Sequence, residues 1–410
     1  MAVAQTQADE HEAAARRPLH GVRVLDLTQF LAGPFCTMIL GDMGADVIKI
    51  EPPGGEVQRN SMKLGGGDLD PPSFLALNRN KRSMVLDLRS EGGRELFYEL
   101  AEQSDVLVEN FKPGTTKKLG IDYETLSAQR PELIYASITG FGDSGPYALR
   151  PGLDLITQGM SGIMSVTGPR GGDPVKAGVA VTDLSSGMFG AIGILNAYIV
   201  RMKTGEGQFV SSSLFEAGVS LAIHESAEMW GRGTIPGPLG SGHRLAAPYQ
   251  GLRAQDGWLT VGAGTDKLWE RFCRAIGRED LLGDERFLGN GKRMENVEAL
   301  EHELERTLMT QPVDHWVELI IDAGVPAGPI LNYQQVLEDP HTLAREMVIE
   351  IDHPKAGRIK GLGSPVKLSK SPLGTPRHPP LLGEHTDEFL VELGIDSDRI
   401  AELRERGVVA

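Results

Sequence analysis

The amino-acid sequence predicts an α/β protein with a parallel sheet and helices on both faces of that sheet. Two observations support this fold class. Over the first 140 residues, short segments rich in Val, Ile and Leu alternate with segments of helical periodicity. The strand segments are nearly continuous apolar runs, which is typical of parallel strands that are buried on both faces.

The predicted elements follow one another in a regular order. VRVLDL predicts the first strand, PFCTMILGDMG has the spacing of a helix, and GGRELFYELAEQ has the pattern of an amphipathic helix. In chain order the expected strands cover 22–27, 46–51, 83–88, 105–111 and 133–141, and the expected helices cover 34–44 and 92–103.

The middle of the chain changes character and predicts a second, smaller domain over 225–330. A Gly- and Pro-rich stretch is followed by a strand in DGWLTVGAG and by three helical patterns, DKLWERFCRAIG, ENVEALEHELERTLMT and VDHWVELIIDAG. We therefore expect a frayed tail over 1–18, the N-terminal part of a large ligand-binding domain over 19–224, and a return to that large domain with a C-terminal wrap over 331–410. The Pro-rich passage 371–390 has no apolar core of its own, so we expect it to wrap another surface.

Composition excludes several classes of protein. The net charge of −15 argues against a nucleic-acid-binding protein. Only two cysteines occur, Cys36 and Cys273, which fits a reducing compartment and argues against a disulfide framework or a zinc cluster. The N-terminus lacks the apolar core of a signal peptide, and the apolar run Met188–Val200 is too short to span a bilayer. We expect a cytoplasmic protein that binds no metal.

Several short motifs are incomplete and carry no function. VGAGTDK has only part of a dinucleotide fingerprint and follows a late strand, and HESAE ends in Glu228 where a zinc-protease helix needs His. His243 lies in the glycine-rich SGSGHR, where it is either a surface residue or part of a mobile lid.

Cations follow several of the predicted strands. In parallel α/β sheets, ligands bind beyond the carboxyl ends of the strands. We assign to that edge the loops 28–34, 78–82, 110–114 and 139–146. These loops and the residues just after them hold Arg79, Lys81, Arg82, Lys112, Lys117 and Lys118. In an acidic protein such a group predicts a polyanion site, although each cation taken alone is equally well an ordinary solvated residue.

One carboxylate stands at the start of the most apolar helix. Asp183 precedes MFGAIGILNAYIV. An aspartate in that place is most often an N-cap, and the alternative is a catalytic carboxylate.

These segments together resemble the class III CoA-transferase family (CaiB/BaiF-like). The resemblance rests on HGVRVLDLTQFLAGPFCTMILGDMGADVIKIEPPGG, LNRNKRSMVLDL, DVLVENFKPG, YASITGFGDSGP, DLSSGMFGAIGIL, GVPAGPI and LGEHTDEFL, in family order from about residue 20 to the C-terminus. It implies a Rossmann-like large domain formed by both chain ends, a small α+β domain between them, and an interlocked homodimer. It also implies that CoA thioesters are substrates and that no cofactor is permanently bound.

The resemblance assigns the CoA-binding residues one by one. They are Leu31, Ala32, Leu77, Asn78, Arg79, Asn80, Asn110, Phe111, Lys112, Lys118 and Thr139. Lys118 stands where the family has arginine, which keeps the charge but not the bidentate geometry. Thr139 stands where some members have lysine, so this position lacks their positive charge.

The family's nucleophile corresponds to Asp183. A carboxylate with an ordinary pKa near ~3.9 is ionised at neutral pH, so it attacks a thioester without a general base. The resemblance implies an acyl-aspartyl anhydride followed by an aspartyl-CoA thioester. Gly242, His243 and Arg244 of the glycine loop are expected to shield the anhydride from water.

The resemblance leaves the reaction and the substrate open. The family's racemases carry a histidine where this chain has Leu153, so a CoA-transferase is favoured over a racemase. A non-catalytic CoA-binding protein is the other alternative, and the presence of Asp183 argues against it. We expect succinyl-CoA as donor and a small dicarboxylic acid as acceptor. Candidates to bind the distal carboxylate are Arg59, Arg150, Arg170, His243 and Arg244.

Overall fold

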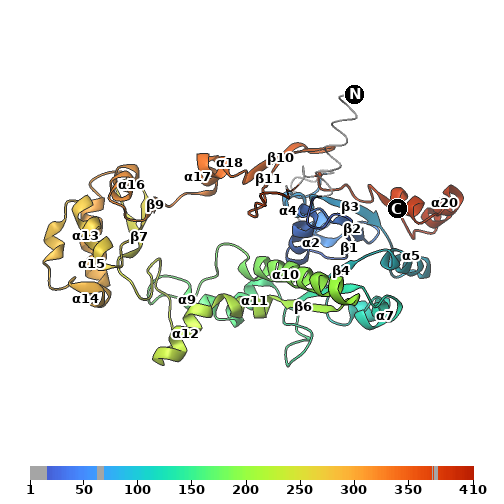
Figure 1. Ribbon diagram of the computed structural model, residues 1–410, viewed down its shortest axis with the longest axis horizontal. Coiled ribbons are helices and arrows are strands. Elements are labelled where there is room, and N and C mark those ends of the chain that lie inside the picture. The colour runs from blue at the N-terminus through green and yellow to red at the C-terminus, as the bar shows by residue number, and fades with distance from the viewer. Residues whose placement is uncertain (1–15, 62–68, 372, 374–376) are drawn as a thin grey trace. The chain divides into compact units, whose positions relative to one another are not determined.

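The structure, a computed structural model, describes residues 16–61, 69–371, 373 and 377–410 (Figure 1). Most of the expected tail, 1–18, therefore lies outside the described residues. The chain forms two compact units. The sheet unit combines both chain ends with Ala177–Gly231, and the central unit comprises Met164–Lys176 and Arg232–Leu343.

The boundaries of the central unit differ from the expected 225–330. The unit's main segment starts and ends later, and the unit also includes Met164–Lys176, which the sequence pattern assigns to the large domain. One reason that this segment joins the unit is a contact between residues far apart in the sequence. The backbone N–H of Gly240 donates to the carbonyl oxygen of Gly168 at 2.8 Å.

The sheet unit is built on six parallel strands in the order β3-β2-β1-β4-β5-β6. Five of them confirm the expected strands, and the sixth, with the polar sequence FVSSS, was missed. The order reverses between β1 and β4, and such a switch point is where open α/β sheets bind ligands. The strands are β1 (Arg23–Asp26), β2 (Asp46–Glu51), β3 (Lys81–Val85), β4 (Val106–Glu109), β5 (Ile134–Thr139) and β6 (Phe209–Ser213).

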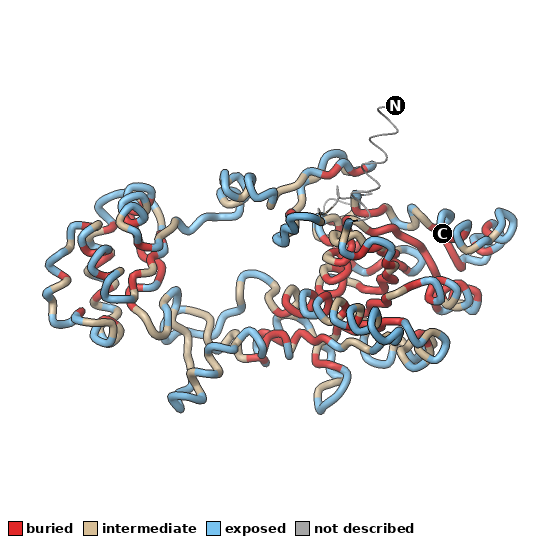
Figure 2. The backbone as a smooth tube through the Cα atoms, viewed as in Figure 1, coloured by how far each residue is buried: buried red, intermediate tan, exposed pale blue. Residues whose placement is uncertain are grey.

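Helices cover both faces of this sheet, as expected. Alternate strand residues point to opposite sides, so the strands contribute to two separate apolar clusters. One cluster packs under α2 (Ala32–Asp42) and α10 (Val181–Thr204), and the other under α5 (Glu91–Glu102), α7 (Tyr123–Gln129), α19 (Thr386–Glu392) and α20 (Ser397–Glu405). In Figure 2 the strands are largely buried and the helices expose their outer sides.

Shorter elements connect these layers. They are α3 (Val57–Ser61), α4 (Pro72–Leu77), α6 (Thr115–Leu119), α8 (Asp154–Met160), α9 (Ile163–Val166), α11 (Leu214–Leu221), α12 (Ile223–Arg232), and the hairpin β10 (Val348–His353) and β11 (Gly357–Leu362). The described part of the Pro-rich passage lies along the edge strand β3, because Ser83 and Val85 bond to His385, Gly383 and Thr386. It therefore covers the edge strand of the sheet.

The central unit packs helices on a small antiparallel sheet. The strands are β7 (Tyr249–Arg253), β8 (Trp258–Gly262) and β9 (Ala327–Pro329). Its core includes Leu259, Phe272, Leu304 and Ile320. The helices are α13 (Asp266–Ala275), α14 (Gly289–Glu295), α15 (Val297–Leu308), α16 (Val313–Asp322), α17 (Tyr333–Glu338), α18 (Pro340–Ala344) and a 3₁₀ turn at Glu279–Leu282.

Among the described helices, α10 alone is long and apolar enough to cross a membrane by length and composition. It is also the crossover helix between β5 and β6, and it buries Ala191, Ile194 and Ala197 against the sheet.

Candidate active site

The N-terminus of α10 brings Asp183 to the carboxyl edge of the sheet. Because α10 connects the parallel strands β5 and β6, it runs back against them and begins where they end. Gly187, one turn after Asp183, packs on the start of α2: a Cβ there would lie 2.5 Å from the carbonyl oxygen of Ala32. Asp183 therefore lies next to the loop that follows β1.

Asp183 is not the N-cap of its helix. The cap position is Ala180, which offers no side-chain hydrogen bond, and Asp183 is the third residue of the helix. The capping is done by Asp154 at the start of α8. Its Oδ1 accepts hydrogen bonds from the backbone N–H of Thr182 at 3.0 Å and from the Thr182 hydroxyl at 2.8 Å, while its Oδ2 accepts one from Gln158 at 2.6 Å.

Burial changes the acid strength of Asp183. The pKa of this carboxyl is raised from 3.8 to about 7, first by desolvation and second by the negative charge of Asp154. In the part of the chain that the structure describes, no group donates a hydrogen bond to the Asp183 carboxylate. The expectation of an ordinary, fully ionised aspartate is therefore wrong, since a substantial fraction is protonated near neutral pH.

Two loops at the carboxyl edge are tied together beside Asp183. The side chain of Asn110, just after β4, accepts from the Gln29 N–H at 2.8 Å and donates to the Gln29 carbonyl oxygen at 2.7 Å. Leu31 occupies the N-cap position of α2, and Ala32 is the first residue of that helix. The structure thus brings Leu31, Ala32 and Asn110 together, as expected.

A cavity of about 260 Å³ opens at the same edge. It is lined by the ends of β1 and β2, the residues after β3, and Phe111. Lys112 and Lys118 follow Phe111 closely in the chain and are exposed. Thr139 is the last residue of β5, and its hydroxyl accepts a hydrogen bond from the Gly142 N–H at 2.9 Å. This edge therefore holds an aromatic side chain and exposed cations.

A buried ion pair supports the loop after β1, and sequence reasoning missed it. Lys49 and Glu56 are both fully buried and lie 3.0 Å apart. Lys49 also donates to the Thr28 carbonyl oxygen at 2.9 Å, while Glu56 accepts from the N–H of Phe30, which has a φ of 65°. The sequence contained a signal for this ion pair, namely the lysine inside the apolar strand DVIKIE. A buried cation needs a counter-charge, so a carboxylate near Lys49 could have been predicted.

The segment 77–82 lies at the amino edge of the sheet. The expectation that it follows a strand at the carboxyl edge is therefore wrong. Lys81 and Arg82 are the first two residues of β3, so residues 77–80 precede this strand at the amino edge of the sheet. The cations of the segment are also already paired: Arg79 with Asp42 at 2.6 Å, Lys81 with Asp26 at 2.9 Å, and Arg82 with Asp46 at 2.6 Å.

The neighbouring residues of this segment serve structural roles. Asn78 is buried, donates to the Phe74 carbonyl oxygen and accepts from Lys81, while Asn80 donates to Asp42. Leu77 ends α4. A contact of Leu77, Asn78, Arg79 or Asn80 with CoA stays a prediction.

The glycine loop belongs to the central unit. The Gly242 N–H donates to the Leu239 carbonyl oxygen at 3.1 Å, and the His243 N–H donates to the Tyr249 carbonyl oxygen at 2.9 Å. The His243 ring stacks on Tyr249 with 4.9 Å between centroids. The loop is therefore held in a defined turn within this unit.

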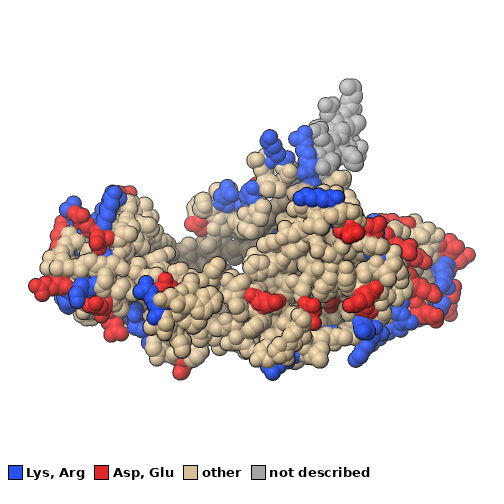
Figure 3. Space-filling model, turned by 60° about the horizontal axis from the view of Figure 1, so that its bottom comes forward, with Lys and Arg blue, Asp and Glu red and all other residues tan. Residues whose placement is uncertain are grey.

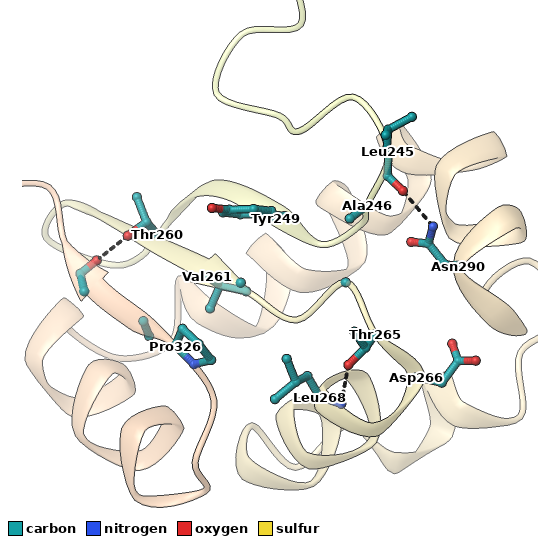
Figure 4. Close-up of a pocket in the computed structure, with 14 residues that line it drawn as sticks. Leu245, Ala246, Tyr249, Thr260, Val261, Thr265, Asp266, Leu268, Asn290 and Pro326 are labelled. Atoms are coloured by element: carbon teal, nitrogen blue, oxygen red, sulfur yellow. Dashed lines mark hydrogen bonds between the residues drawn. The ribbon is translucent and has the colours of Figure 1, made fainter. Parts of the chain in front are cut away.

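The residues after this loop line a cavity of about 910 Å³ (Figure 4). Leu245, Ala246 and Tyr249 form one wall, and β8, the start of α13 and Pro326 form the others. Asn290 fixes the loop by donating to the Leu245 carbonyl oxygen at 2.8 Å.

The described residues contain no group of three or more His, Cys, Asp or Glu side chains arranged to hold a metal ion. The site is therefore described by its carboxylates, backbone donors and cations.

Comparison with known proteins identifies the family to which this chain belongs. The model of CoA-transferase family III matches residues 19–386, so the chain belongs to this family and is a CoA-transferase. The human succinyl-CoA:glutarate CoA-transferase is 37% identical, covering 96% of this chain and 90% of that protein. The succinyl-CoA:mesaconate CoA-transferase of Haloarcula hispanica is 40% identical, covering 92% and 96%.

A solved structure shares the fold. A CaiB/BaiF family protein from Brucella suis aligns with a TM-score of 0.83 and 39% identity, over 92% of this chain and 99% of that one.

Proposed function

We propose that this CoA-transferase moves CoA from succinyl-CoA to a short dicarboxylic acid, with Asp183 as the nucleophile. The main support is the placement of Asp183 at the carboxyl edge, partly desolvated and without hydrogen-bond donors on its carboxylate among the described residues. The names of the relatives support the substrate class, since those enzymes use succinyl-CoA with glutarate or mesaconate.

The first half-reaction cleaves the donor thioester. The ionised carboxylate of Asp183 attacks the succinyl carbonyl carbon, the C–S bond breaks, and CoA leaves as a thiolate. The thiolate then attacks the aspartyl carbonyl of the resulting anhydride, which releases succinate and forms an aspartyl-CoA thioester.

The second half-reaction repeats these steps with the acceptor. A carboxylate of the acceptor attacks the aspartyl thioester, which gives a new anhydride and the CoA thiolate. Attack of the thiolate on the acceptor carbonyl forms the new acyl-CoA and restores Asp183.

Backbone donors at the start of α10 suit the oxyanions of these steps. The Asp183 N–H finds no acceptor among the described residues, because its cap residue is Ala180. An N–H group at a helix N-terminus stabilises developing negative charge.

We further propose that CoA binds at the carboxyl edge, in and around the cavity lined by Phe111, with Lys112 and Lys118 near its phosphates. The glycine loop, with Gly242, His243 and Arg244, closes over the anhydride and excludes water.

Buried, unpaired thiols at Cys36 and Cys273 support a cytoplasmic location.

We also propose that the functional unit is an interlocked homodimer. The outer side of α10 exposes Met188, Phe189 and Ile192 by 43–51%, and Trp230 and Ile235 are exposed by 78% and 90%. Figure 3 shows a broad area with few charged side chains. Large apolar side chains that are exposed in this way are typical of an interface between subunits. Light scattering is expected to give the dimer mass, and a monomer at assay concentration would contradict it.

The decisive experiment incubates the protein with succinyl-CoA and a panel of free acids and identifies new acyl-CoAs by mass spectrometry. We expect transfer to dicarboxylates, and loss of all transfer in Asp183→Ala with CoA binding retained by calorimetry. Borohydride or hydroxylamine added during turnover is expected to label Asp183. Unchanged turnover in Asp183→Ala, or a label on another residue, would refute the mechanism.

A further inference from the structure

We infer that Glu109, the last residue of β4, is a positioning residue that holds Phe111 in the wall of the cavity at the carboxyl edge of the sheet. The inference rests on the proposed binding of CoA in and around that cavity. Phe111 lines the cavity, whereas Glu109 is buried and does not line it. Glu109 therefore acts on a ligand in this cavity through Phe111 and not by contact.

Strands β1, β2 and β4 each end in a buried carboxylate, and the carboxylate of β4 differs from the other two. Asp26 at the end of β1 lies 2.9 Å from Lys81, and Glu51 at the end of β2 lies 2.7 Å from Arg59. In the parts of the chain that the structure describes, no cation pairs with Glu109. Its burial is therefore not compensated by an ion pair.

Burial of the Glu109 carboxyl is unfavourable in itself. Desolvation raises the pKa of this group, while hydrogen bonds from Ser137 and from the Phe111 N–H act in the opposite direction. An apolar side chain of similar size in the same place would carry no such penalty. What the carboxyl supplies, and an apolar side chain would not, is its hydrogen bonds, and one of them goes to the loop after β4.

This hydrogen bond fixes the backbone of the loop at Phe111. Glu109 Oε2 accepts from the Phe111 N–H at 2.8 Å, and this N–H has no other acceptor among the described residues. Asn110, which stands between them, is held by its two hydrogen bonds to Gln29. The backbone is thus fixed at two successive residues, so the Phe111 side chain leaves it in one direction.

The Phe111 side chain lies between the core and the cavity. It packs against the apolar cluster that contains Leu107, and it also lines the cavity together with Thr115 and Leu119 of α6. An aromatic ring supplies a large contact area to a ligand only while it faces that ligand. The contribution of Phe111 to CoA binding therefore depends on the direction of the loop, which Glu109 controls.

Calorimetric titration of the intact protein with CoA tests the inference without any transfer reaction. Glu109→Met removes the acceptor at a similar side-chain length and is expected to weaken CoA binding about tenfold, the effect of roughly one hydrogen bond. KM for the acyl-CoA should rise by the same factor while kcat changes by less than about twofold, because Asp183 is unaffected. Glu109→Gln keeps an acceptor and should recover most of the lost affinity. The matched control, Glu102→Met, replaces an exposed carboxylate of α5 and should leave CoA binding unchanged.

A double-variant cycle tests whether Glu109 acts through Phe111. Phe111→Ala alone should weaken CoA binding, and Glu109→Met added to it should cost less than about twofold more, since the side chain that Glu109 positions is already absent. Glu109→Leu is a second variant without an acceptor and should behave like Glu109→Met. Additive losses in this cycle, or a loss that Glu109→Gln does not recover, would overturn the inference.

The outcomes separate this inference from the proposed function. If Phe111→Ala weakens CoA binding and Glu109→Met does not, the proposed CoA site stands and the inference fails. If both weaken binding in a non-additive way but the parent transfers no CoA, the inference stands and the proposed transfer fails. Parent affinity in Phe111→Ala would refute the proposed CoA site and the inference with it.

Discussion

Asp183→Asn is predicted to stabilise the fold while it abolishes CoA transfer. The amide keeps the size of the side chain but carries no charge to be desolvated. The pKa of Asp183 is raised from 3.8 to about 7 in the fold. Between these values the unfolded chain has released its proton and the native chain still holds it. The unfolded state therefore binds fewer protons, and the stability of the parent falls as the pH rises.

The magnitude follows from that shift. One pKa unit corresponds to about 1.36 kcal/mol. Relative to the Asp183→Asn variant, the parent is therefore less stable by at most about 4 kcal/mol above pH 7, where the full shift from 3.8 to about 7 counts, and by about 1.5 kcal/mol at pH 5. The advantage of the variant should thus grow by about 2.5 kcal/mol between pH 5 and pH 8, or roughly 5 °C in melting temperature at ~2 °C per kcal/mol.

Thermal unfolding of parent and Asp183→Asn at pH 5 and pH 8 measures this difference. Asp173→Asn, which removes an exposed carboxylate, is the matched control for the loss of one negative charge. An Asp183→Asn advantage that is equal at both pH values, or a variant less stable than the parent at pH 8, would refute the reasoning about burial.

Three further perturbations test the surroundings of Asp183, the proposed nucleophile. Asp154→Asn removes a neighbouring negative charge, so the midpoint of kcat/KM against pH should move below about 7, and an unmoved midpoint would contradict the electrostatic role of that residue. Lys49→Met leaves the buried carboxylate of Glu56 without its counter-charge. This should lower the free energy of unfolding by about 3–5 kcal/mol and raise KM for the acyl-CoA. Wild-type values for both would show that the ion pair does not support the loop after β1. Gly187→Ala places a Cβ 2.5 Å from a backbone oxygen of α2, which should lower the free energy of unfolding by about 1–3 kcal/mol. The control Gly178→Ala has nothing within 4 Å of its Cβ and should leave the stability unchanged. Equal melting temperatures of the two variants would contradict the close packing at Gly187.

Local patterns were sufficient for much of the fold. The apolar strands and the amphipathic helices between them were recognised from the sequence because burial imposes a periodicity of two or 3.6 on neighbouring residues. β6 was missed since its sequence, FVSSS, has little apolar character, and it joins the sheet by pairing with β5.

The candidate site was predicted in part. Resemblance to a family pointed to Asp183, Leu31, Ala32 and Asn110, which the structure brings to one edge of the sheet. The pattern of strands and loops placed Arg79 at that edge, although Arg79 lies just before β3, at the amino edge of the sheet, and pairs with Asp42. The error came from treating the residues before β3 as if they followed it.

The sequence by itself determined the class of fold, the family, and the helix that carries the proposed nucleophile, Asp183. Only the tertiary structure decided which charges neutralise one another and how acidic Asp183 is. Asp154 and Thr182 are 28 positions apart, and Arg79 and Asp42 are 37 apart. Such pairs form when packed elements bring distant residues into contact. A local pattern contains no information about that distance, and both ion pairing and desolvation depend on it.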